Sequence, residues 1–124
     1  MIVDEQAYAQ QLRLQEEGGP RTFTILIGLF EALAIQHALD EAGERPLTHR
    51  LLLDAIGALG ASLERVVIDD VERGPKGDTF FAKLVLDQGG RQLKIDCRPS
   101  DGIAVGVHAG VSFYVTEKVM DAVS

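Results

Sequence analysis

The residues best suited to chemistry lie close together in one segment, Ile95-Asp96-Cys97-Arg98-Pro99-Ser100-Asp101. The apolar pattern around it predicts that a strand ends and a helix begins there. The first amide groups of a helix lack partners within the helix and carry partial positive charge, so the junction favours anions. Arg98 could bind a phosphate group through two parallel hydrogen bonds. Asp101 could serve as a metal ligand or as a general base in phosphodiester hydrolysis.

The same residues also have purely structural interpretations. Ser100 is a typical N-cap, and Asp101 would interact favourably with the helix dipole from the first turn, together worth about 1 kcal/mol. Arg98 could instead pair with Asp96 or Asp101 and fix the loop. Ser100 is also a candidate substrate-binding residue.

A second junction with the same pattern occurs earlier, in residues 25–35. A shift of about 70 residues, too long for a solenoid repeat, pairs Glu31 with Asp101. If a pseudo-two-fold axis relates the two copies, these carboxylates either approach each other or lie at opposite ends. If they approach, Glu31, Asp96 and Asp101 together would offer the oxygen ligands that Mg²⁺ or Mn²⁺ prefers.

Two further candidates precede or begin a predicted helix in the first half. His49 follows Thr48, a suitable N-cap, and would be a general base near neutral pH. It could instead bond only to a neighbouring carbonyl group. Arg45 is a second candidate phosphate ligand nearby. Cys97 is expected to point into the sheet as a small apolar group.

These residues must be positioned by an α+β chain in which the same order of elements occurs twice. Gly-Gly turns between alternating segments predict two β-hairpins, and periodic apolar residues followed by glycine predict helices. We expect a single domain over residues 1–124, built from two β-β-β-α-α type repeats at about 10–60 and 80–124. The expected elements are hairpins at 12–27 and 80–97, strands at 65–69 and 111–115, helices at 30–42, 48–60, 100–109 and after 116, and a loop at 73–78.

Composition limits the possible partners. Nineteen acidic against twelve basic residues give a net charge of −7, and no run of Lys and Arg occurs. Such a chain should bind RNA or DNA weakly unless a metal or a local basic face helps, because phosphate neutralisation supplies most of that affinity. A single cysteine cannot form an internal disulfide, so nothing in the sequence indicates an oxidising compartment. No apolar run approaches the roughly 20 residues that a membrane-spanning helix needs. We therefore expect a cytoplasmic protein.

Four blocks of sequence, in this order, resemble the bifunctional nuclease domain family. The blocks are residues 27–35, 45–52, 79–84 and 95–104. The resemblance implies two repeats around a single barrel-like sheet with helices packed outside, self-association, and nuclease activity on RNA and DNA. Gly102 stands where the family usually has alanine, which would weaken the start of that helix by about 0.5–1 kcal/mol. An apolar patch around Phe113 and Tyr114 favours a homodimer.

Two hypotheses about function follow. The first is a metal-assisted phosphodiesterase acting on RNA and DNA, and the second is a non-catalytic module that binds a small ligand or a protein. In the first hypothesis, the metal ligands are Glu31, Asp96 and Asp101, the substrate-binding residues are Arg45, Arg98 and Ser100, and the catalytic residues are Glu31, His49 and Asp101. A shared cleft holding Glu31, His49, Arg98 and Asp101 would favour the enzyme. Separate locations would favour the binding module.

Overall fold

The computed structural model describes residues 3–4, 9–40 and 48–123. Arg45 therefore lies outside the described residues. The elements in chain order are β1 (Val3–Asp4), β2 (Ala9–Gln15), β3 (Thr22–Gly28), α1 (Leu29–Asp40), α2 (Thr48–Ala58), β4 (Ser62–Gly74), β5 (Gly77–Gln88), β6 (Arg91–Cys97), α3 (Pro99–Ala109), β7 (Ser112–Val115) and α4 (Glu117–Val123). None of the helices in these residues is long and apolar enough to cross a bilayer.

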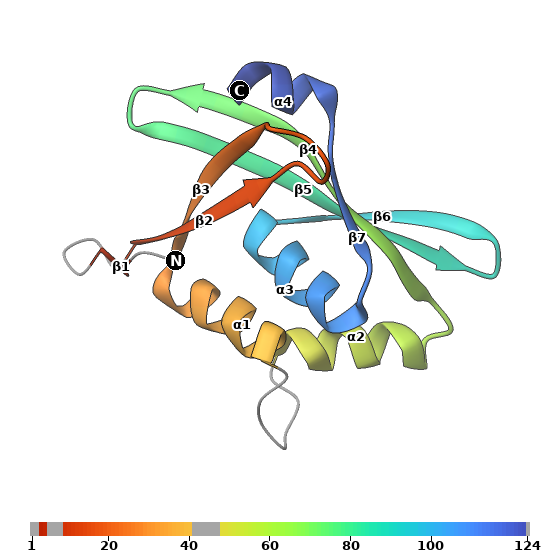
Figure 1. The fold of residues 1–124 in the computed structure, drawn as a ribbon. Coiled ribbons are helices and arrows are strands. Elements are labelled where there is room, and N and C mark those ends of the chain that lie inside the picture. The colour runs from red at the N-terminus through yellow and green to blue at the C-terminus, as the bar shows by residue number, and fades with distance from the viewer. Residues whose placement is uncertain (1–2, 5–8, 41–47, 124) are drawn as a thin grey trace.

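The strands form two sheets (Figure 1). The first is antiparallel with the order β1-β2-β3, and the second has the order β6-β5-β4-β7, with β7 parallel to β4. The α+β class is confirmed. The described strands do not form the single barrel-like sheet that the resemblance implies, because no ladder joins the β2–β3 hairpin to the four-stranded sheet.

The two halves of the chain share one apolar core. The alternation of β3 buries Phe23, Ile25 and Ile27, and the Phe23 ring stacks on the Phe80 ring of β5 with centroids 5.3 Å apart. Buried residues of α1, α3 and α4 belong to the same cluster. The repeats therefore stabilise each other through side chains where backbone hydrogen bonds do not connect them.

Helix α3 packs on the four-stranded sheet and against α1 and α2 (Figure 1). Its first eight residues are almost all buried, and Gly102 lies within this stretch. A Cβ atom at Gly102 would lie 2.8 Å from Val66 Cγ1 and 3.2 Å from Cys97 Sγ. The glycine thus allows α3 to approach β4 closely. The tight packing that results offsets the lower helix propensity of glycine.

The loop predicted at residues 73–78 is too long, because only residues 75–76 form the turn between the two strands. Strands β4 and β5 extend into both ends of the segment, with Arg73 opposite Asp78 and Gly74 opposite Gly77. Arg73 Nε also lies 2.6 Å from Asp78 Oδ1. The strand residues here could not be predicted because the end of this hairpin is exposed and polar, so the apolar alternation that marks a half-buried strand is missing.

Candidate functional site

The site lies where β6 ends and α3 begins. Arg98 is the N-cap with extended backbone angles, φ −71° and ψ 149°, as expected for a residue before proline, and Pro99 is the first helical residue. The prediction that Ser100 is the N-cap is therefore wrong. Ser100 lies inside the first turn and is only 5% exposed. It borders a shallow hollow beside β3 and Arg98, and its role in substrate binding stays a prediction.

The guanidinium of Arg98 binds two carboxylates from different elements. Its Nε and Nη2 donate to Asp101 Oδ2 and Oδ1 at 2.8 and 2.9 Å, and its Nη1 donates to Glu31 Oε1 at 2.8 Å. Asp101 belongs to the first turn of α3 and Glu31 to the first turn of α1. Of the two arrangements expected for the repeat-related carboxylates, the structure has the one in which they approach each other.

His49 joins this group from the first turn of α2, with Nε2 3.3 Å from Asp101 Oδ1. Glu31, His49, Arg98 and Asp101 form what we call the Arg98 network. Its members come from three separate segments of the chain and meet around one carboxylate and one guanidinium. A histidine that shares a carboxylate in this way has its ring orientation and tautomer constrained by it.

The charges in the Arg98 network stabilise one another. The pKa of Asp101 is lowered mainly by the hydrogen bonds from Arg98, against the effect of burial and with a smaller contribution from His49. The pKa of Glu31 is lowered by its own backbone N–H and then by Arg98, while the nearby Asp101 opposes this. The pKa of Arg98 is raised by the same two partners. With a neutral histidine, two carboxylates and one guanidinium leave the network with one net negative charge.

The network borders a shallow depression with an apolar side. Helix α1 contributes Phe30 and Leu33 to it, and α2 contributes Thr48 and His49. Phe30 is 82% exposed. Phe30 was not among the residues predicted from the sequence, although its position offers a signal: it lies outside the buried stripe formed by Ala32, Ile35 and Ala38. A large aromatic side chain left in solvent beside charged groups is available to a ligand.

Asp96 is not part of the Arg98 network. Its carboxylate lies 2.9 Å from Lys83 Nζ on the neighbouring strand, and Lys83 also lies 3.0 Å from Asp69. These two carboxylates raise the pKa of Lys83. Lys83 and Asp96 are directly opposite in the β5–β6 register, so a cross-strand ion pair accounts for the position of Asp96.

A divalent cation does not fit the described residues as they are arranged. Among them, no group of three or more His, Cys, Asp or Glu side chains is placed to hold a metal ion. The guanidinium of Arg98 instead occupies the position between Glu31 and Asp101 and compensates their charge. The site therefore presents a cationic side chain where a metal ligand set was expected.

Cys97 confirms its predicted structural role. Its side chain packs against both apolar clusters of the core, and burial raises the pKa of its thiol to about 11. Nucleophilic or metal-binding cysteines need a lowered thiol pKa, because the thiolate is the reactive form. Cys97 therefore has a packing role beneath the Arg98 network.

The fold and the Arg98 network define a small α+β domain with an acid–base cluster at a helix start, and the comparisons agree with the resemblance found in the sequence. The family profile described as bifunctional nuclease domain matches residues 12–124, and the chain belongs to this family. It is 45% identical over 112 residues to uncharacterized proteins from two strains of Mycobacterium tuberculosis. The match covers 88% of this chain and 63% of each of those relatives.

Proposed function

We propose that this chain is a nuclease-like phosphodiesterase and that the Arg98 network is its active centre. The observation that carries the proposal is the convergence of Glu31, His49 and Asp101 on Arg98 from three segments of the chain. The family description supports the class of reaction.

The proposed roles follow from the chemistry of the side chains. Phosphodiester cleavage requires proton transfer at the attacking and leaving oxygens and stabilisation of the charge that develops on phosphorus oxygens. His49, oriented by Asp101, would transfer protons. Arg98 would exchange one carboxylate for a phosphate oxygen, since guanidinium groups bind both in the same geometry. Glu31 would then act as the partner that Arg98 leaves and regains.

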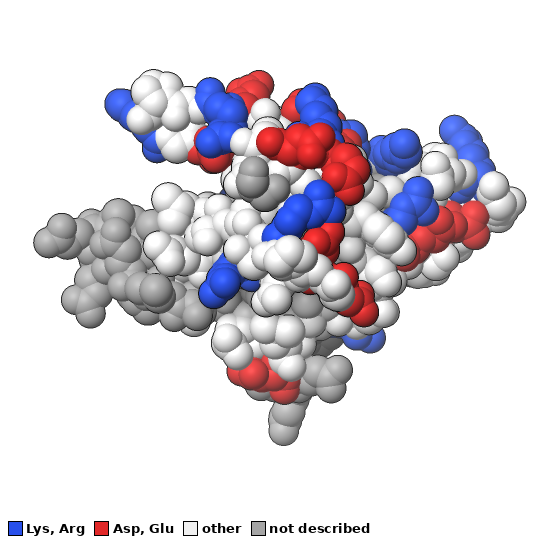
Figure 2. Space-filling view, turned by 45° about the horizontal axis from the view of Figure 1, so that its top comes forward, with Lys and Arg blue, Asp and Glu red and all other residues white. Residues whose placement is uncertain are grey.

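The electrostatics of the surface predict modest affinity for nucleic acid. Lys and Arg side chains are intermixed with Asp and Glu on the face in Figure 2, and no continuous basic surface is seen there. The Arg98 network itself carries two carboxylates for one guanidinium. Binding of RNA or DNA should therefore depend on few phosphate contacts and weaken only gradually with salt, because the salt dependence grows with the number of phosphates neutralised.

The test is cleavage of fluorescent single-stranded RNA and duplex DNA, with EDTA, Mg²⁺ or Mn²⁺ in separate reactions. We expect His49→Ala and Arg98→Ala to lower the rate by about a hundredfold or more, the usual loss when an acid–base or charge-stabilising group is removed. Arg65→Ala is the matched control, because Arg65 forms an ion pair with the adjacent Glu64 and is not a member of the Arg98 network. Equal cleavage by all four proteins would contradict the proposal.

A non-catalytic binding module is the second candidate, and one observation favours it. Three N–H groups of Arg98 already donate to carboxylates of α1 and α3, which is what an interhelical clamp requires. If purified protein cleaves neither substrate under any of the three conditions, the Arg98 network is a clamp and the chain a binding module.

Self-association and a cytoplasmic location remain proposals of the same kind. Helix α1 carries exposed apolar side chains in addition to the buried ones, since Leu33 and Leu39 are more than half exposed, as is Phe30. A helix with apolar residues on its outer side as well as its core side is usually covered on both. We propose that a second copy covers α1 in a homodimer, which light scattering after size-exclusion chromatography would detect as twice the chain mass.

A further inference from the structure

A second concave surface lies at the opposite end of β3 from the Arg98 network, between the turn of the β2–β3 hairpin and β7 with α4. It is a groove of about 500 Å³, within the usual size range of ligand sites. We call it the β2–β7 groove. Its lining residues are Leu14, Gln15, Glu16, Glu17, Arg21, Phe23, Ile68, Ile103, Ser112, Phe113, Tyr114, Val115, Glu117 and Met120.

Both strands that border the groove present an edge to it. Strand β7 is the outer strand of its sheet, and β1 pairs only with the first two residues of β2. Four consecutive residues of β7 line the groove, as do residues 14–17, at the end of β2 and the start of the turn that follows it. Successive side chains of a strand point to opposite faces, so a consecutive run can line a groove only along the strand edge.

The backbone of β7 leaves hydrogen-bonding groups directed away from β4. The Thr116 N–H donates to Ile68 O, and Tyr114 pairs with Val67 in the parallel ladder. Because backbone groups alternate between the two sides of a strand, the N–H and C=O groups of Phe113 and Val115 point away from β4, toward the groove. Among the described residues, no ladder pairs with this side of β7.

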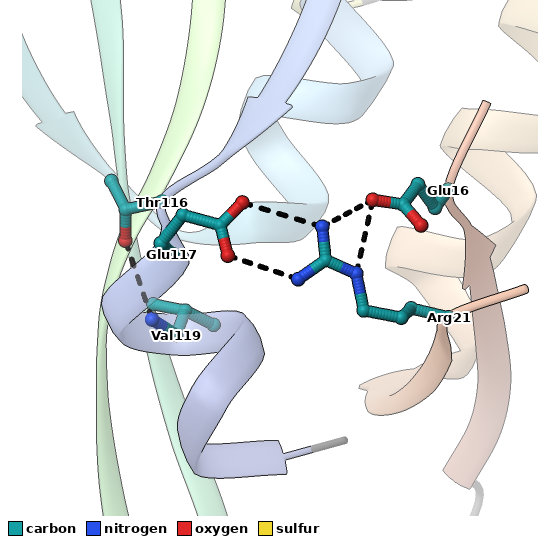
Figure 3. Close-up of polar contacts among 5 residues, drawn as sticks. All are labelled: Glu16, Arg21, Thr116, Glu117 and Val119. Atoms are coloured by element: carbon teal, nitrogen blue, oxygen red, sulfur yellow. Dashed lines mark hydrogen bonds and ion pairs between the residues drawn. The ribbon is translucent and has the colours of Figure 1, made fainter. Parts of the chain in front are cut away.

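The floor of the groove is apolar and its rim is acidic. Phe23, Ile68 and Ile103 belong to the buried core beneath it. At one end, Arg21 lies between Glu16 and Glu117 (Figure 3), with Nη1 2.9 Å from Glu117 Oε2 and Nε 3.0 Å from Glu16 Oε2. Glu17 adds a further carboxylate. Three carboxylates and one guanidinium give the rim a net negative charge.

We propose that the β2–β7 groove binds an extended peptide segment of a partner protein, in which apolar and basic side chains alternate, as an added strand along β7. Free edge groups require another backbone as their complement, which a compact small ligand does not supply. Alternation places every second side chain on the apolar floor and the others at the acidic rim. This inference is independent of the proposed nuclease activity, since no member of the Arg98 network lines the groove.

The test uses a fluorescent eight-residue peptide of alternating valine and lysine, with fluorescence anisotropy as the readout of binding to the full chain. A valine–glutamate peptide of the same length is the charge control, and a peptide methylated at alternate backbone nitrogens is the edge control. We expect saturable binding of the valine–lysine peptide alone. Glu17→Lys and Glu117→Lys should each weaken it by about tenfold. Glu64→Lys, outside the groove, should leave it unchanged.

Glu17→Lys should leave the fold intact, because Glu17 is an exposed residue of the β2–β3 turn. Weaker peptide binding by this variant would therefore report on the charge of the groove and not on unfolding. Equal binding of the methylated peptide would show an apolar pocket without strand addition and overturn the proposal. Equal binding to Glu17→Lys and Glu117→Lys, or no binding of the valine–lysine peptide, would also overturn it. So would a homodimer in which Phe113 and Tyr114 are protected by the second copy, since the groove would then be an interface between copies.

Discussion

Replacing Arg98 with alanine separates a catalytic role from a structural one, and the structure sets the size of the expected effect. The substitution removes three hydrogen bonds to two carboxylates. Glu31 and Asp101 are 25% and 28% exposed, so water can hydrate them after the change. The penalty of about 3–5 kcal/mol for an unpaired buried charge therefore does not apply.

Arg98 itself is 64% exposed, which reduces the contribution of its ion pairs further. Exposed pairs contribute about 0–1 kcal/mol each, and a bidentate geometry lies at the upper end of that range. We expect Arg98→Ala to lower the free energy of unfolding by about 1–2 kcal/mol near neutral pH. Arg98→Lys should recover roughly half of the loss, because it keeps the charge but not the two parallel hydrogen bonds.

The stability difference between wild type and Arg98→Ala should depend on pH, and the shifted carboxylate pKa values determine the direction of the change. Arg98 lowers the pKa of both Glu31 and Asp101 in the folded chain. Their contribution to stability is therefore present above the carboxylate pKa of the unfolded chain, about 4, and disappears as the pH falls through the lower folded values. The difference between wild type and Arg98→Ala should be full at neutral pH and shrink below roughly pH 4.

Urea unfolding followed by circular dichroism at several pH values measures this difference, with Arg65→Ala as the control for loss of an exposed arginine. A loss of stability below about 0.3 kcal/mol at neutral pH, or one that does not change with acidification, would refute the electrostatic argument. A variant that keeps its stability but not its cleavage activity would place Arg98 in catalysis rather than in a clamp.

Two further predictions concern Gly102 and Cys97, which pack beneath the Arg98 network. Gly102→Ala should gain about 1 kcal/mol of helix propensity but lose about 1–3 kcal/mol through overpacking against Val66, so we expect a net loss of stability. In a Val66→Ala background the same change should stabilise the protein, which a double-mutant cycle of urea midpoints would measure. With a folded thiol pKa of about 11 against an ordinary 9.0, Cys97 should react with iodoacetamide about a hundredfold more slowly at pH 8 than in the urea-unfolded chain; equal rates would contradict the burial of the thiol.

The sequence sufficed for the elements whose signal is local. Gly-Gly turns and apolar alternation located the β2–β3 and β5–β6 hairpins. The strand residues on each side of the β4–β5 turn, 70–74 and 77–79, were missed because most of them are exposed and polar. The N-cap was misassigned for a related reason. Ser100 has the better cap chemistry, but proline is preferred at the first helical position, so the N-cap lies two residues earlier, at Arg98.

Tertiary features were predicted only where the repeat carried the information. Matching Glu31 with Asp101 anticipated that the two carboxylates could approach each other, and the structure places both on Arg98. Asp96 was grouped with them because it is near in sequence, whereas strand register pairs it with Lys83. Open edges along the two sheets could not be predicted at all, since closure of a sheet depends on which distant strands meet.

The repeat also explains why a single guanidinium serves two carboxylates. The shift that pairs Glu31 with Asp101 pairs Gly28 with Arg98, so the first copy has glycine where the second has arginine. A Cβ atom at Gly28 would overlap Glu31 Oε2, which means that the glycine provides the space into which this carboxylate folds. A second arginine there would fill that space and compensate both negative charges. The asymmetry between the copies thus leaves Arg98 shared between two carboxylates, a position from which it can release one and still be held by the other.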